Sequence, residues 1–211
     1  MNHHSRLLAR TVLGAVLIGW VLLCAACGQH VTNAGPGGVD TPHLDAPPSN
    51  VKAVLFQGIS LPVADQGPHD QAGAVVSGFD RDPIGAALAA IHATVRMSVA
   101  TDSQWAIIGQ QMLAPGAGRD AWAVARAQIS ITDPIATNPP TIAGYRVVNY
   151  TPADADVDIY TVQPDRSITR NNAHVIWQNS DWKLLLPNQS RSSPVTVVVS
   201  LPIDLIRLSL P

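Results

Sequence analysis

The chain of 211 residues contains no glutamate, and only 13% of its residues are charged. All 15 acidic residues are therefore aspartates. Because glutamate and lysine favour exposed helices, the lack of one and the scarcity of the other disfavour a helical bundle. The net charge of −2 provides no basic surface to neutralise phosphates, so we expect no nucleic-acid partner.

Cysteine is nearly absent as well. Only Cys24 and Cys27 are present, and both lie near the N-terminus. If Cys24 is removed with a signal peptide and Cys27 is modified, no thiol remains for a disulfide. The fold must then be stabilised by its core alone.

The N-terminus has the three parts of a secretory signal. Residues 1–10 carry Arg6 and Arg10, residues 11–23 are almost wholly apolar, and small residues follow. At about 1.5 Å per residue, the apolar segment is shorter than the ~30 Å hydrocarbon core of a bilayer. The sequence predicts a signal peptide over residues 1–26, cleaved between Ala26 and Cys27. The alternative is an ordinary signal or an uncleaved signal anchor.

Leu23-Cys24-Ala25-Ala26-Cys27 resembles the lipobox of bacterial lipoproteins. It departs from the family pattern at Cys24, where leucine is usual. The resemblance implies that Cys27 receives a diacylglycerol group and a fatty acid such as palmitate. It also implies a lipid-anchored protein of the cell membrane that faces the extracytoplasmic side.

Residues 27–50 are rich in Gly, Pro, Asn, Asp and Thr and predict a flexible membrane tether. Residues 51–211 then predict a single α+β domain with its core at about residues 80–187. Before that core we expect one short strand near residues 53–57, in an arm that lies across the domain.

Three helices are predicted in the first half of the domain. Asp82 and Pro83 have the form of a helix cap and first helical residue, and apolar residues recur at helical spacing up to Val99. A second helix is expected over residues 102–113, where Thr101 and Gln104 form a capping box. A third is expected over residues 120–129, with Trp122, Ala125 and Ile129 inward.

From residue 141 the apolar period changes to two. Four segments rich in β-branched and aromatic residues predict about four antiparallel strands, the last two joined by a tight turn at residues 179–181. The final stretch could add a strand and a tail that packs back. The expected fold is α+β, with helices packed on a curved antiparallel sheet.

This element order resembles the cone-shaped fold of the NTF2-like and cystatin-like proteins. A tighter resemblance is to an uncharacterised family of secreted or membrane-anchored envelope proteins of high-GC Gram-positive bacteria, with a GFxxxPxGAxxAA signature. The matching residues here are Gly78, Phe79, Pro83, Gly85, Ala86, Ala89 and Ala90. That resemblance implies an envelope protein and leads us to expect a link to a conjugation or secretion apparatus. It carries over no activity.

Two acidic stretches do not predict an ion site. Asp80-Arg81-Asp82 is interpreted as a helix start, in which Asp82 is the cap. Residues 154–158, Asp-Ala-Asp-Val-Asp, lack the glycine and glutamate of a calcium loop and are interpreted as the solvent face of a strand that blocks edge pairing. Without converging His or Cys ligands, we expect neither a metal nor a cofactor.

The sequence favours a non-enzymatic envelope lipoprotein that binds a protein partner. The first alternative is a carrier of a small apolar ligand in the cavity of the cone. The second is an enzyme of the dehydratase or isomerase type, with His92, Tyr145, Asp158, Tyr160 and His174 as titratable candidates. The residues expected to line such a pocket are His92, Trp105, Tyr145, Tyr160 and Trp177.

Overall fold

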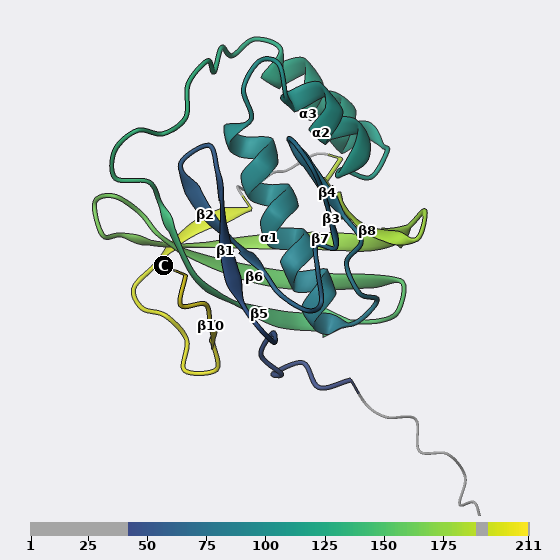
Figure 1. Ribbon diagram of the computed structural model, residues 1–211, viewed down its shortest axis with the longest axis vertical. Coiled ribbons are helices and arrows are strands. Elements are labelled where there is room, and N and C mark those ends of the chain that lie inside the picture. Colours follow the sequence, from purple (N-terminus) through teal and green to yellow (C-terminus); the bar gives the residue numbers. More distant parts are fainter. Residues whose placement is uncertain (1–41, 189–193, 211) are drawn as a thin grey trace, which may run out of the picture. The chain divides into compact units, whose positions relative to one another are not determined.

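The computed structural model describes residues 42–188 and 194–210 (Figure 1). The predicted signal peptide, its cleavage site, Cys27 and the first part of the predicted tether lie outside these residues. The strands are β1 (Lys52–Phe56), β2 (Ile59–Val63), β3 (Asp70–Ala72), β4 (Val75–Ser77), β5 (Thr141–Tyr150), β6 (Asp154–Val162), β7 (Ile168–Gln178), β8 (Asp181–Leu185), β9 (Val195–Val198) and β10 (Ile206–Arg207). The helices are α1 (Pro83–Val99), α2 (Trp105–Gln111) and α3 (Ala117–Arg126).

The main sheet is antiparallel and has six strands in the order β10-β5-β6-β7-β8, with β9 also paired to β7. The four strands expected from the alternating segments are β5 to β8. The additional two come from the final stretch, which was expected to add a strand and a returning tail. The tight turn is confirmed: Asn179 and Ser180 both have positive φ, which matches a two-residue hairpin loop.

α1 begins where the sequence predicts. The side chain of Asp82 accepts a hydrogen bond from the Gly85 amide at 2.6 Å, and Pro83 occupies the first helical position. A cap of this kind satisfies one of the amides that the first turn leaves without a helical partner.

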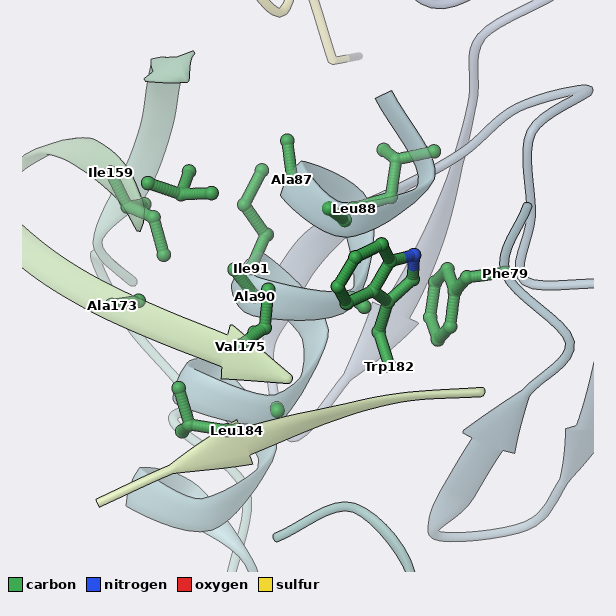
Figure 2. Close-up of a cluster of buried hydrophobic side chains, with 14 of the residues drawn as sticks. Phe79, Ala87, Leu88, Ala90, Ile91, Ile159, Ala173, Val175, Trp182 and Leu184 are labelled. Carbon is green, nitrogen blue, oxygen red and sulfur yellow. The ribbon is translucent and has the colours of Figure 1, made fainter. Parts of the chain in front are cut away.

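α1 is buried on both sides. It lies across one face of the main sheet, and the hairpins β1-β2 and β3-β4 cover its other side (Figure 1). Its alanines permit this close approach, and residues 86–91 are almost fully inaccessible to solvent. Figure 2 shows Leu88 and Ile91 among Val175, Trp182 and Leu184 of the sheet. This face of the sheet is therefore covered along residues 86–91 by the helix.

The two N-terminal hairpins were not predicted, because only one short strand was expected before residue 80. β1 and β2 are joined through Gln57 and Gly58, both with positive φ. Gln57 is an unusual residue for that conformation, so the turn has little signature in the sequence. Asn50, the last residue of the predicted tether, donates to the Asp65 side chain at 2.6 Å.

The second and third helices differ from the expected bounds. α2 begins only at Trp105, although the Gln104 side chain accepts from the Thr101 amide as half of the predicted capping box. α3 begins and ends about three residues earlier than expected. The prediction that Ala125 and Ile129 point inward is wrong: both are exposed, because α3 packs on α2 at the surface and turns Arg126 inward.

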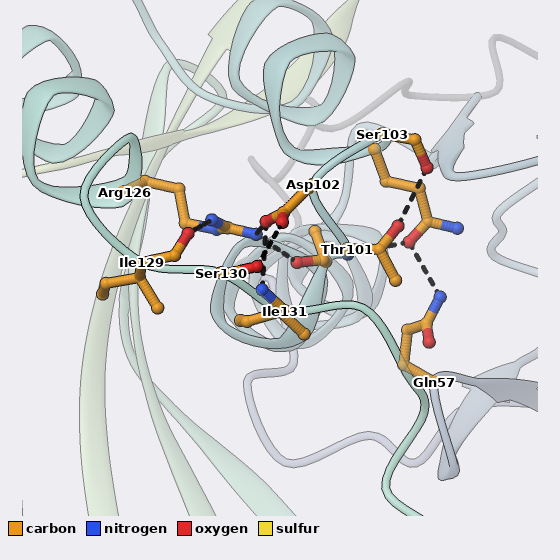
Figure 3. Close-up of polar contacts among 10 residues, drawn as sticks. Gln57, Thr101, Asp102, Ser103, Arg126, Ile129, Ser130 and Ile131 are labelled. Atoms are coloured by element: carbon orange, nitrogen blue, oxygen red, sulfur yellow. Dashed lines mark hydrogen bonds and ion pairs between the residues drawn. The ribbon is translucent and has the colours of Figure 1, made fainter.

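Arg126 and Asp102 form a hydrogen-bond network that holds the segment after α3 against the residues just before α2 (Figure 3). The Arg126 guanidinium donates to the Ala100 carbonyl at 2.8 Å and to Asp102 at 3.0 Å. Asp102 also accepts from Ser130 at 2.7 Å and from the Ile131 amide at 3.0 Å. These hydrogen bonds lower the pKa of Asp102, with the Ile131 amide as the largest cause. The network fastens the segment after α3 to the start of the α2 region.

Candidate functional site

The Gly-Phe-Asp-Arg-Asp-Pro motif, residues 78–83, connects the start of α1 to the main sheet. The Phe79 amide donates to the Asp181 side chain at 3.2 Å, and the Trp182 indole donates to the Asp80 carbonyl at 2.9 Å. Both contacts connect the start of α1 to β8. Arg81 lies over the ring of Trp177, with its guanidinium carbon 5.0 Å from the ring centroid. The motif thus holds α1 on the sheet.

The small residues of the motif are required by this close approach. A Cβ on Gly85 would lie 2.1 Å from the Asp80 carbonyl oxygen, so no larger side chain fits without a backbone shift. Ala86 is fully buried. Gly78 has a φ of +75°, a conformation that glycine adopts without strain.

The five residues predicted to line one pocket are placed in separate environments. His92 lies in the core between α1 and β2, and Trp105 packs edge-on against Trp122 at a centroid distance of 6.0 Å. Trp177 contacts Trp182 at the β7-β8 hairpin. Tyr145 is buried in the core, whereas Tyr160 lies on the opposite face of the sheet.

His92 is a buried core residue, and both of its ring nitrogens are hydrogen-bonded within the chain. Its Nε2 donates to the Pro62 carbonyl at 2.7 Å, and its Nδ1 accepts from Nε of Arg96 at 3.3 Å. Burial lowers the pKa of His92 to about 3, which keeps the ring neutral near pH 7. Arg96 also donates to the Ala74 carbonyl and lies over Phe56. The pair therefore connects α1 to the N-terminal hairpins.

Tyr145 is equally inaccessible. Its hydroxyl is buried without a hydrogen-bond partner, and this burial raises the pKa of the phenol, with a smaller contribution from the charge of Asp82. A phenol that stays protonated in the core is unsuited to exchange protons with a ligand.

The face of the main sheet opposite α1, which we call the outer face, carries a set of charged and polar residues. Six of them form the outer-face cluster: Arg146, Asp156, Asp158, Arg170, Asn172 and His174. They share this face because they pair across β5, β6 and β7, while the alternate residues point into the core.

Asp158 is the centre of the outer-face cluster. It is only 3% exposed. It accepts hydrogen bonds from the guanidinium of Arg146 and from the side-chain amide of Asn172, each at 3.1 Å. Arg170 lies farther away, with Nε 4.0 Å from the carboxylate. Hydrogen bonding to Asp158 is the main cause of the raised pKa of Arg146, and Asp204 adds to it.

This geometry corrects one interpretation from the sequence. The aspartates at 154–158 do not protect a sheet edge, because β6 lies between β5 and β7. Asp158 is buried and paired instead. A buried carboxylate in this position needs a cationic partner, which Arg146 provides from the neighbouring strand.

Asp156 and His174 face each other directly. The Nδ1 atom of His174 lies 2.8 Å from Oδ1 of Asp156, and both side chains are 36% exposed. Because a carboxylate only accepts, this contact places the imidazole proton on Nδ1 and leaves Nε2 available to another group. His174 also lines a pocket of about 610 Å³ on the outer face.

Sequence reasoning identified Asp158 and His174 as titratable candidates but did not pair either of them. It missed Arg146, Arg170 and Asn172. Their partners depend on the register of β6 against β7, in which Asp156 meets His174 and Asp158 meets Asn172. The alternation of aspartates was a visible signal, but the register that gives it meaning is set by the folded sheet.

Within residues 42–188 and 194–210, no cluster of three or more His, Cys or acidic side chains could hold a metal ion. In the same part of the chain, none of the helices is long and apolar enough to cross a membrane.

A family model described as a domain of unknown function (DUF8175) matches residues 25–202. Searches of the curated proteins and of the solved structures return no significant match to the chain.

Proposed function

We infer the role of this chain, which belongs to the DUF8175 family, from its N-terminal sequence and from the outer face of its sheet. It is a lipid-anchored protein on the extracytoplasmic side of the cell membrane, and it binds a protein partner without catalysis. The partner belongs to the envelope, in a conjugation or secretion apparatus. The resemblance of Gly78–Ala90 to envelope proteins of high-GC Gram-positive bacteria supports this assignment.

The observation that carries the binding role is the contrast between the two faces of the sheet. α1 covers one side along residues 86–91, whereas the outer face presents polar and charged pairs in which Arg146, Asp156 and His174 remain partly exposed. Complementary charges of this kind contribute to specificity and to the rate of association with a partner. The succession of α1 to α3 and then β5 to β8 also supports a cone of the NTF2-like type, with its concavity occupied by α1.

Anchoring is tested by replacing the proposed lipidated residue. We expect Cys27→Ala to abolish acylation and to shift the protein out of the membrane fraction. The acyl chains on Cys27 are the proposed membrane anchor, and the variant would carry none of them. The measurement is intact mass together with fractionation of the cells. Cys24→Ala is the matched control and should leave the mature mass unchanged. An unaltered mass and membrane partition for Cys27→Ala would contradict the lipid anchor.

A stable envelope partner should co-purify with the full chain from solubilised membranes after reversible crosslinking. The same capture with Cys27→Ala should recover less of that partner, because the protein no longer lies at the membrane surface. If wild-type protein captures nothing specific, and no transfer or secretion genes lie near the gene, the binding role is wrong.

An acid–base enzyme is the second candidate, favoured by the contact between Asp156 and His174 beside the pocket. A carboxylate that orients an imidazole is a common arrangement for a general base. Such an enzyme would exchange the α-hydrogens of a carbonyl or hydroxy-acid substrate with deuterium from solvent. NMR of a panel of such acids in D₂O tests this, with His174→Gln as the reference. Equal exchange for both proteins would remove this candidate.

A further inference from the structure

The pocket on the outer face has the size and composition of a ligand site. Its volume of about 610 Å³ lies within the range of roughly 300–1,000 Å³ typical of small-molecule sites. Polar residues from β7 form one wall, and apolar residues from the end of β8 form another. The residues used in the argument are Arg170, Asn172, His174, Leu185, Leu186 and Pro187.

On the polar side of the pocket, Arg170 has guanidinium N–H groups that are not used in hydrogen bonds to Asp158. Its nearest carboxylate, Asp158, is 4.0 Å away and already accepts from Arg146 and Asn172 at 3.1 Å. The Nε atom of Arg170 is buried and has no hydrogen-bond partner. The side chain is nevertheless 40% exposed, so the donors that a carboxylate or phosphate can reach are the terminal N–H groups of the guanidinium rather than the buried Nε.

The rest of the pocket divides into a polar and an apolar part. His174 offers Nε2, because its Nδ1 is held by Asp156 at 2.8 Å. Leu185, Leu186 and Pro187 contribute apolar surface to the lining, which a charged ligand alone would not need. The combination fits a ligand with one charged end and an apolar body.

We propose that this pocket binds a small amphiphile with an anionic headgroup. The carboxylate or phosphate pairs with Arg170, and the apolar body lies against Leu185 and Leu186. This binding activity goes beyond the proposed recognition of a protein partner and does not depend on it, because the geometry of the pocket alone carries it.

The test uses the full chain in phosphatidylcholine nanodiscs and isothermal titration calorimetry, with empty nanodiscs as the blank. The probes are octanoate, octyl phosphate, octan-1-ol and butyrate. We expect the two octyl anions to bind at least about tenfold more tightly than octan-1-ol, which cannot pair with a guanidinium, and than butyrate, which buries less apolar surface. The tighter of the two octyl anions identifies the headgroup.

Arg170→Gln should weaken the preferred anion by at least about tenfold, and Arg207→Gln, an exposed arginine at the opposite edge of the sheet, should not change its affinity. If Arg170→Gln loses its cooperative thermal transition, Arg170→Lys takes its place and should bind more weakly than wild type. Three results would each overturn the proposal: equal affinity for octan-1-ol and octanoate, no effect of the Arg170 substitution, or no heat above the blank.

Discussion

Gly85 shows how a single absent side chain fixes the position of α1. A Cβ at this residue would meet the Asp80 carbonyl oxygen at 2.1 Å and the Asp80 amide nitrogen at 2.8 Å. Both are backbone atoms of the loop that holds α1 on β8. Neither can move without disturbing the hydrogen bonds between this loop and β8.

Gly85→Ala is therefore expected to lower the free energy of unfolding by about 1–3 kcal/mol, the range for overpacking in a well-packed site. Urea denaturation of the purified protein measures this change. Ser98→Ala, on an exposed position of the same helix, is the control and should stay within about 0.5 kcal/mol of wild type. A neutral Gly85→Ala would show that the Asp80 loop is not fixed as described.

His92 makes stability depend on pH. Burial holds its pKa at about 3 in the folded protein, against 6.5 for the free side chain. Above pH 6.5 the ring is neutral in both states, so the free energy of unfolding is unaffected by this group. As the pH falls from 6.5 towards 3, the unfolded chain takes up a proton that the folded protein does not. Stability then falls by up to about 1.4 kcal/mol per pH unit.

His92→Gln should reduce this loss, because glutamine keeps a donor for the Pro62 carbonyl and takes up no proton. Urea midpoints at pH 7, 5.5 and 4.5 measure the slope for each protein. His43→Gln, on an exposed side chain, is the matched control and should retain the wild-type slope. If His92→Gln and wild type lose stability in parallel, the histidine is not buried in its neutral form.

At the scale of elements, the cap of α1 contributes measurably to the free energy of unfolding. Asp82→Ala removes the acceptor for the Gly85 amide, and we expect a loss of about 1 kcal/mol in the free energy of unfolding. Asp82→Asn keeps a side-chain oxygen at the same place and should recover most of that loss. Thermal or urea unfolding of the three proteins tests the cap. If the alanine and asparagine variants are equally stable, the side-chain acceptor does not stabilise the helix.

Elements with a strong local signal were predictable from the sequence. α1 has a cap, a proline and a regular apolar period, and β5 to β8 alternate clearly between two faces. The hairpins β1-β2 and β3-β4 were missed because their strands are short and their conformation depends on packing over α1. The end of α3 was misplaced because buried Arg126, rather than an apolar residue, forms the inward contact.

The candidate site was less predictable than the fold. His174 and Asp158 were recognised as titratable, but their partners lie on neighbouring strands 12 to 18 residues away in the sequence. Which residues meet depends on strand register, and that register is fixed by burial of Val157 and Val175 on the core face. No local pattern in a single strand contains this information.

At the scale of the whole molecule, the two faces of the sheet differ in burial and in charge. The α1 side is occupied by Leu88, Ile91 and the surrounding core, so it stabilises the fold. The outer face holds Asp158, Arg146 and Arg170 in a network that is only partly covered. If the proposed lipid anchor at Cys27 and the proposed partner are correct, this partly exposed face is the surface that the protein presents to the partner.

The most direct test of this account is site-specific photocrosslinking in intact cells. A benzophenone amino acid is placed either at Asn172, which is exposed on the outer face, or at Val124, which is 65% exposed on α3. After irradiation, the size of the crosslinked product is measured by immunoblotting. We predict a discrete protein adduct from position 172 and none from position 124. An adduct from position 124 alone, or no adduct from either position, would contradict recognition through the outer face.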